Sequence, residues 1–117
     1  MGRINSKRKG KTGELNFCED FEKATGIKLK RNWIQTVVGG NLTPDVKGWD
    51  AAHIEVKRTE AVHLFKWQER VLNECGHRIP VIAHRRSRAD WWLFLRLEDL
   101  PMLAQALIEE MGNGSQK

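Results

Sequence analysis

The sequence predicts a single α/β (α+β) domain in which helices flank one mixed β-sheet. Its 117 residues suffice for one domain with its own apolar core. Segments with apolar residues at helical spacing alternate with short segments of strand-like pattern, and glycines or polar turn residues separate them. The resulting order of elements, αβββαββα, is typical of a sheet covered by helices.

The first predicted helix begins near Gly13, with Thr12 as its N-terminal cap, and ends at Gly26. Its inner face is defined by side chains at positions i, i+3, i+4 and i+7, which lie on one side of a helix. These side chains are Glu14, Phe17, Cys18 and Phe21. An inward-facing glutamate needs a partner, because a buried carboxylate without one is costly.

Two further helices are predicted over residues 61–75 and 98–111. The first has a strong apolar stripe that Gln68 interrupts, and Gly76 ends it. The second has an apolar inner face formed by Leu100, Leu103, Leu107 and Met111.

The segments with a strand-like pattern are residues 31–38, 44–49, 52–58, 78–84 and 91–97. A Gly39-Gly40-Asn41 loop separates the first from the second. A short turn at residues 48–50 joins the second to the third, which predicts an antiparallel hairpin.

The net charge of +5 and the pI of about 9.5 come from the N-terminus, because residues 1–11 contain five basic residues and no acidic one. We expect a flexible basic arm over residues 1–12, one domain over residues 13–111 and a frayed tail over residues 112–117. A basic arm suits a polyanionic ligand, although a solvated tail that only aids solubility has the same composition.

The two cysteines, Cys18 and Cys75, fall on apolar helix faces and are expected to be buried free thiols in a reducing compartment. No apolar run is long enough to span a bilayer, and the basic N-terminus lacks the apolar stretch of a secretory signal. The sequence therefore predicts an intracellular protein.

Asp45, Glu55 and Lys57 stand where the local pattern favours other residue types. Glu55 and Lys57 are two apart in a strand and point to one face, whereas Ile54 and Val56 point to the other. The predicted hairpin would bring Asp45 beside them. Carboxylates hold hard cations such as Mg²⁺, and a neighbouring lysine can orient or deprotonate an attacking water. The pattern indicates phosphodiester hydrolysis.

Each part of this pattern also has a simpler explanation. An E-x-K tripeptide is common on the solvent face of an edge strand, where it forms an ordinary cross-strand ion pair. A Pro-Asp pair is common in turns. The combination of both at this spacing favours the catalytic interpretation.

The sequence resembles the PD-(D/E)XK nuclease superfamily, because Pro44-Asp45 is followed after nine residues by Glu55-Val56-Lys57. Within the superfamily it is most similar to the small archaeal-type and phage Holliday junction resolvases. The similarity spans residues 9–85 and rests on Lys9-Gly10, Gly13-Glu14, Arg31, Gly39-Gly40, Pro44-Asp45-Val46 and Ile54-Glu55-Val56-Lys57-Arg58.

The resemblance implies a restriction-endonuclease-like core and Mg²⁺-dependent cleavage of DNA, with Mn²⁺ able to substitute. It implies that Lys57 is the catalytic lysine. In several branches a glutamine on the following helix faces the active site, which makes Gln68 a further catalytic candidate; alternatively, Gln68 bonds a backbone group in the core. The implied metal ligands are Glu14, Asp45, Glu55 and the backbone carbonyl of Val56.

Basic residues outside the site are expected to contact the phosphate backbone without reading sequence. The candidates are Arg3, Lys7, Arg8, Lys9, Lys11, Lys30, Arg31, Arg58, Arg85, Arg86 and Arg88. The adjacent Trp91 and Trp92 point to opposite strand faces, so one of them is expected to be exposed. An exposed aromatic residue and the need to cut two strands both favour a homodimer.

We therefore expect a Holliday junction resolvase that acts in DNA recombination. It would work in the cytoplasm, including that of a phage-infected bacterial host. The alternatives are a nuclease for flaps, nicks or other replication intermediates, and a non-catalytic DNA-binding protein on the same fold.

Overall fold

The computed structural model describes residues 6–32 and 44–115 of the chain. The elements follow in the order α1 (Ser6–Thr25), β1 (Lys30–Arg31), β2 (Val46–Lys47), β3 (Ala52–Arg58), α3 (Leu64–Glu74), β4 (Ile79–Arg85), β5 (Trp92–Phe94), the 3-10 turn η1 (Leu97–Asp99) and α4 (Leu100–Ser115). This order agrees with the predicted αβββαββα, with a short 3-10 turn added before the last helix.

The central sheet contains three strands in the order β3-β4-β5. β3 runs parallel to β4 and β4 runs antiparallel to β5, so the predicted mixed sheet is confirmed. β1 and β2 form a separate antiparallel pair. The predicted hairpin of residues 44–49 with 52–58 is borne out only in part: β2 forms its ladder with β1, but the N–H of Asp45 donates to the carbonyl of Ile54 at 3.1 Å, so the two segments do lie side by side.

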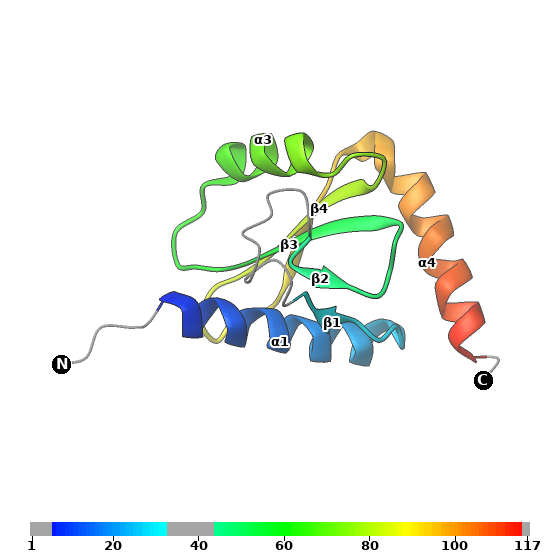
Figure 1. Cartoon of the computed structure of the whole chain (residues 1–117), viewed down its shortest axis with the longest axis horizontal. Helices are drawn as coiled ribbons and strands as arrows, with labels where there is room; N and C mark the ends of the chain where they lie inside the picture. Colours follow the sequence, from blue (N-terminus) through cyan, green and yellow to red (C-terminus); the bar gives the residue numbers. More distant parts are fainter. Residues whose placement is uncertain (1–5, 33–43, 116–117) are drawn as a thin grey trace.

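Helices α1 and α3 cover opposite faces of the central sheet (Figure 1). Residues alternate along β3, so that Ile54 joins the core beneath α1 while the residues on either side of it turn toward α3. The core beneath α1 includes Phe17, Phe21, Ile54, Val81 and Ala83. The smaller core beneath α3 consists of Trp67, Val71 and Ile82, with Leu64 and Phe94 packed against it.

The first helix begins at Ser6, so the predicted start near Gly13 with a Thr12 cap is wrong. Most of the segment expected as a flexible arm thus forms the first turns of α1. Lysine and arginine are favourable helix formers, and their propensity outweighs the one glycine, Gly10, in this stretch. Gly13 has a packing reason to be in the helix, because a Cβ there would lie 3.1 Å from the Cβ of Arg58 in β3.

Several other boundaries differ from the predictions. β3 spans the predicted residues 52–58, whereas β2 and β5 are much shorter than expected. α3 begins at Leu64 and not at residue 61, with His63 at its N-terminal cap position. Of the predicted first strand, the structure shows only the start as β1; residues 33–43, including the Gly39-Gly40-Asn41 loop, lie outside the described residues.

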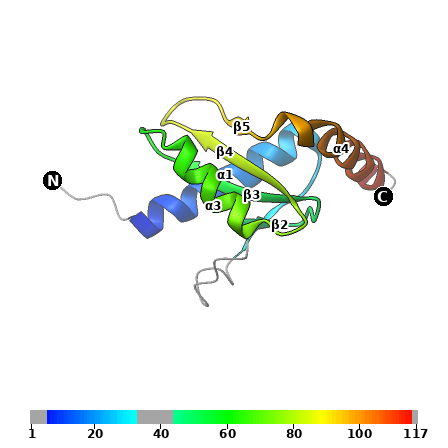
Figure 2. The ribbon, with the colours of Figure 1, turned by 90° about the horizontal axis from the view of Figure 1, so that it is seen from above.

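The last helix continues through Ser115, past its predicted end at residue 111; the frayed tail over residues 112–117 stays a prediction. α4 leaves the layered body at one end of the molecule (Figure 2). Leu103 is buried and Leu107 packs against the α1-side core, as predicted. Leu100 and Met111, also predicted to face inward, are 49% and 40% exposed. No described helix has the length and apolar character needed to cross a membrane.

The two tryptophans at the start of β5 point to opposite faces, as predicted. Trp91 packs edge-on against Phe17 with ring centres 5.1 Å apart, and its Nε1 donates to Asp20 at 2.9 Å. Trp92 is 67% exposed. Trp91 therefore fastens the sheet to α1, whereas Trp92 is available at the surface.

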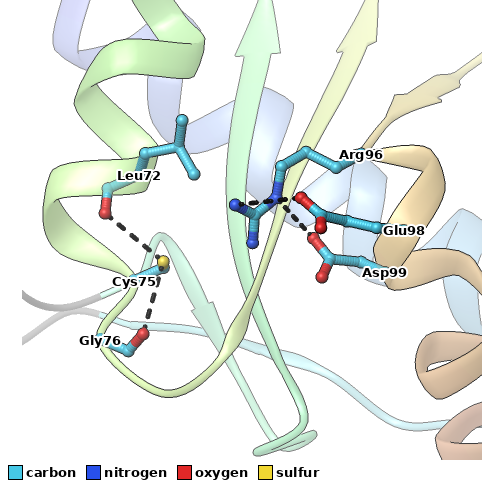
Figure 3. A network of polar contacts seen from close by, with 6 residues as sticks. All are labelled: Leu72, Cys75, Gly76, Arg96, Glu98 and Asp99. Carbon is cyan, nitrogen blue, oxygen red and sulfur yellow. Dashed lines mark hydrogen bonds and ion pairs between the residues drawn. The ribbon is translucent and has the colours of Figure 1, made fainter.

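Local polar contacts fix the end of α3 and the chain after β5 (Figure 3). The thiol of Cys75 donates to the carbonyls of Leu72 and Gly76 at 3.6 and 3.7 Å. Arg96 pairs with Asp99 at 2.8 Å in the turn before α4. Both cysteines are free and buried, as predicted, and burial raises the pKa of the Cys18 thiol to about 11.

Gly48→Ala is expected to destabilise the protein by about 1–3 kcal/mol. Gly48 has a φ of +119°, and a Cβ there would lie 2.8 Å from the carbonyl oxygen of Lys28. Urea unfolding followed by circular dichroism measures the loss. Gly112→Ala is the control, because nothing lies within 4 Å of its added Cβ and alanine favours a helix. An equal loss in both variants would contradict the steric argument.

Candidate metal centre

Asp45 is fixed by backbone hydrogen bonds on both sides. Its N–H donates to the carbonyl of Ile54 in β3 at 3.1 Å, and its carbonyl accepts from the N–H of Asn32 at 2.9 Å. The side chain is buried, and its Oδ2 accepts a 2.7 Å hydrogen bond from the N–H of Val56. The carboxylate is therefore held against β3 at the residue next to Glu55.

Glu55 and Lys57 lie side by side on the face of β3 that α3 covers. Glu55 is only 3% exposed, and its Oε2 lies 3.7 Å from Nζ of Lys57. The same Nζ lies 5.7 Å from the centre of the Trp67 ring of α3. The predicted shared face is confirmed, and its burial excludes the simpler explanation that this is a solvent-facing ion pair.

Glu14 faces inward from α1, as predicted, and binds an arginine. Its Oε1 accepts a 2.7 Å hydrogen bond from Nε of Arg31 in β1. Burial raises the pKa of Glu14 and the negative charge of Asp45 raises it further, whereas Arg31 opposes both effects. Glu14 thus interacts electrostatically with Asp45, and Arg31 offsets part of the repulsion between the two carboxylates.

The electrostatics of the site centre on Glu55. Burial is the largest cause that raises its pKa from 4.5 to about 7, and repulsion by Asp45 adds to it. Lys57 and Arg70 act in the opposite direction. A buried carboxylate with this environment is destabilised in its charged form, and a bound cation would relieve the cost.

A second group of possible ligands was not anticipated from the sequence. His53, Glu55 and Glu74 bring one ligand atom each to within 4.8 Å of one another, so they could hold a metal ion. His53 and Glu55 are two apart in β3 and share its α3-side face. Glu74 lies seven residues after Trp67 and three after Val71, on the buried stripe of α3. That spacing was a usable signal, but only in combination with the position of α3 over β3.

An unsatisfied buried oxygen also indicates that these side chains could bind a divalent cation. Glu55 Oε1 is buried and has no hydrogen-bond partner within the described part of the chain. Buried polar atoms are normally satisfied, so such an atom needs an explanation. Carboxylate oxygens are the ligands that Mg²⁺ and Mn²⁺ prefer.

The two remaining site candidates are Gln68 and the backbone of Val56. Gln68 is exposed on α3 and lines a cavity of about 220 Å³ together with Phe94, Leu95 and Arg96. The alternative placement of Gln68 in the core is therefore wrong. Val56 meets the site through its N–H, which orients Asp45; metal binding by its carbonyl stays a prediction.

Two of the predicted DNA-binding residues are engaged within the fold. Arg31 pairs with Glu14, and Arg85 pairs with Asp20 at 3.4 Å while lying 5.4 Å from the centre of the Trp91 ring. These two arginines therefore hold elements of the fold together.

The other candidates are distributed over α1, β1 and the loops. Lys30, Arg86 and Arg88 are exposed, and Arg58 is half-buried. Arg3 lies outside the described residues. The first turns of α1 carry Lys7, Arg8, Lys9 and Lys11.

The loop after β4 is tied to the loop that follows Lys57. The backbone carbonyl of Glu60 accepts a hydrogen bond from Nε of Arg86 at 3.1 Å, and its side-chain Oε1 accepts one from the N–H of Ser87 at 2.9 Å. Nε2 of His84 lies 2.9 Å from the carbonyl of Thr59. The basic loop and the end of β3 are therefore joined through several contacts.

Comparison of the chain with protein-family models, with curated proteins and with solved structures finds no match.

Proposed function

We propose that this chain is a Mg²⁺-dependent endonuclease that hydrolyses phosphodiester bonds in DNA on a restriction-endonuclease-like core. The observation that carries the proposal is the pairing of two buried carboxylates with one lysine. Asp45 is 7% exposed, Glu55 is 3% exposed, and Lys57 Nζ lies 3.7 Å from Glu55. Burying this much negative charge has no structural benefit that apolar residues would not supply better.

Each side chain has a distinct role in this proposal. A bound Mg²⁺, for which Mn²⁺ can substitute, would polarise the scissile phosphate and lower the pKa of a bound water. Asp45 and Glu55 would hold it, and Glu14 would contribute directly or through water. The ammonium of Lys57 would orient the attacking water and offset charge on the phosphate in the transition state. The Val56 N–H keeps Asp45 in position at 2.7 Å.

The proposed substrate is branched DNA, with the four-way junction of recombination as the leading candidate. The support is the resemblance of the motif to junction resolvases and the placement of exposed basic residues, which suit phosphates and not base edges. Flaps, nicks and other replication intermediates are the alternative substrates. Such an enzyme would act in the cytoplasm, including that of a phage-infected bacterium.

A homodimer would supply the two active sites needed to cut two strands. Its support is a series of exposed apolar side chains on β5, η1 and α4, since exposed apolar patches favour protein interfaces. They are Trp92 (67% exposed), Leu97 (84%), Met102 (68%) and Ile108 (69%).

A cleavage assay with Mg²⁺ on four-way, three-way, flap and linear DNA of matched sequence tests the proposal. We expect cleavage of the four-way junction and little cleavage of linear duplex. Cleavage of flaps alone would contradict the proposed four-way-junction substrate but support the proposed phosphodiester hydrolysis. Binding of all four DNAs without cleavage, in Mg²⁺ and in Mn²⁺, would favour the non-catalytic DNA-binding protein instead.

The basic residues of the first turns of α1 are expected to contribute to DNA binding through phosphate contacts. Replacing Lys7, Arg8, Lys9 and Lys11 with glutamine keeps helix propensity but removes four positive charges. We expect weaker binding and a log–log salt slope that is shallower by up to about 3–4. Titration of labelled DNA at several salt concentrations measures the slope. An unchanged slope would mean that these residues do not contact DNA.

A further inference from the structure

We propose that His53, Glu55 and Glu74 form a second divalent-cation site, and that it selects a zinc-class ion such as Zn²⁺ or Co²⁺ over Mg²⁺. The site lies on the α3 side of β3 and shares only Glu55 with the pair formed by Asp45 and Glu55. It does not depend on nuclease activity.

The backbone places these three side chains together. His53 and Glu55 occupy alternate positions of β3, and Glu74 belongs to the last turn of α3, which packs over that face. Their ligand atoms lie within 4.8 Å of one another. His53 is 1% exposed and the Glu74 side chain is 10% exposed, so the group is enclosed by protein.

The decisive observation is which atoms lack partners. His53 Nε2, Glu55 Oε1 and Glu74 Oε2 are all buried and have no hydrogen-bond partner in the described part of the chain. The other oxygen of each glutamate is already engaged. Glu74 Oε1 accepts from Nε of Arg70 at 3.2 Å, and Glu55 Oε2 faces the ammonium of Lys57 at 3.7 Å. Each glutamate therefore has one carboxylate oxygen that could bind a cation, while its other oxygen is engaged by Arg70 or Lys57.

A cation accounts for these three atoms better than protein contacts alone. Two carboxylate oxygens and an imidazole nitrogen are all electron-pair donors to a metal, and desolvating them without a partner is costly. One nitrogen with two oxygens matches the three-protein-ligand pattern of open zinc sites.

The imidazole of His53 is the group that would make the site prefer Zn²⁺ or Co²⁺ to Mg²⁺. Mg²⁺ prefers oxygen ligands in near-ideal octahedral geometry and gives up its water reluctantly. Imidazole nitrogen suits Zn²⁺ and Co²⁺ better, and their affinity for mixed nitrogen and oxygen ligands exceeds that of Mn²⁺. The Asp45–Glu55 pair offers oxygen alone and therefore suits Mg²⁺. Two chemically different cation sites would then meet at one glutamate.

The test is Co²⁺ binding to the full chain, followed by visible absorption, with Zn²⁺ and Mg²⁺ as competitors. We expect one equivalent of Co²⁺ with d–d bands, displaced by stoichiometric Zn²⁺ but not by a large excess of Mg²⁺. Glu74→Gln and His53→Asn should each weaken Co²⁺ binding by about 100-fold or more. Glu69→Gln, an exposed change of the same type on α3, should bind as the wild type does. Circular dichroism shows whether each variant folds, and Glu74→Gln serves where His53→Asn does not.

Two results would overturn the inference: Co²⁺ binding that Mg²⁺ displaces as readily as Zn²⁺, or unchanged Co²⁺ binding in folded Glu74→Gln. Asp45→Asn separates this site from the proposed function, because it should abolish cleavage but retain Co²⁺ binding. If wild-type protein binds Co²⁺ as expected yet cuts no DNA, the nuclease proposal fails and this site stands.

Discussion

Replacing Asp45 with asparagine is expected to reduce DNA cleavage by roughly 1,000-fold or more while leaving DNA binding intact or slightly tighter. The substitution keeps the size of a side chain that is 7% exposed and an oxygen that can still accept the 2.7 Å bond from the Val56 N–H. It removes one negative charge, which weakens cation binding and lessens repulsion of phosphate. Single-turnover cleavage and a binding titration with Ca²⁺, measured on the same protein sample, separate the two effects.

Asp50→Asn is the matched control for this substitution. Asp50 carries the same functional group at the surface, with a side chain 96% exposed and a weak pair to Arg78 at 3.8 Å. We expect wild-type cleavage from it. Lys57→Ala should lose cleavage to a similar degree, with Lys47→Ala, in the exposed position of β2, as its control. Full activity of folded Asp45→Asn would falsify the proposed centre.

The metal-free protein is expected to lose stability as pH rises from about 4 to above 7, and Glu55 is the main cause. Its pKa is raised to about 7, chiefly by burial and then by Asp45 and Glu74, against Lys57 and Arg70. The folded state therefore binds this proton more tightly than the unfolded chain does. The resulting stabilisation is complete below the ordinary glutamate pKa of 4.5 and disappears as pH rises through the folded pKa of about 7. Each pH unit between the two pKa values removes about 1.4 kcal/mol of it.

Urea unfolding of chelator-treated protein between pH 4.5 and 8 measures this effect. Glu55→Gln should show a shallower pH dependence and exceed the wild type in stability at pH 8, although it is expected to be inactive. Glu69→Gln should keep the wild-type dependence. The comparison isolates Glu55, because Glu14 and His53 titrate in all three proteins. If the curves of wild type and Glu55→Gln stay parallel, Glu55 is not the responsible group.

The local pattern predicted β3 and its two faces fully, because alternation over residues 52–58 is a property of the strand itself. Burial of Ile54 follows from this pattern, whereas burial of Glu55 on the other face depends on α3, which covers it (Figure 1). The start of α1 was missed for the opposite reason. No apolar periodicity marks residues 6–12, and helix propensity alone extends the helix there.

Long-range arrangement explains the other differences. Pairing of β3 with β4 and of β1 with β2 is decided by which surfaces pack together, which no short window of sequence contains. For the same reason the sequence did not indicate Glu74 as a possible ligand, because its role depends on the final turn of α3 lying over His53 and Glu55. Nor did it indicate the pair of Arg31 with Glu14, which joins β1 to α1.

The contacts of Glu60 join the basic loop after β4, a proposed phosphate-binding segment, to the chain that follows Lys57, the proposed catalytic lysine. The loop that carries Arg86 and Arg88 is bonded to the chain only three residues beyond Lys57, through Glu60 at 2.9 and 3.1 Å. A phosphate held by this loop would therefore stand at a defined distance from the lysine, since these hydrogen bonds join the two segments. Glu60→Ala would remove only the Oε1 contact with the Ser87 N–H and would leave the carbonyl contact with Arg86, so we expect it to widen the distribution of cut positions before it lowers the rate.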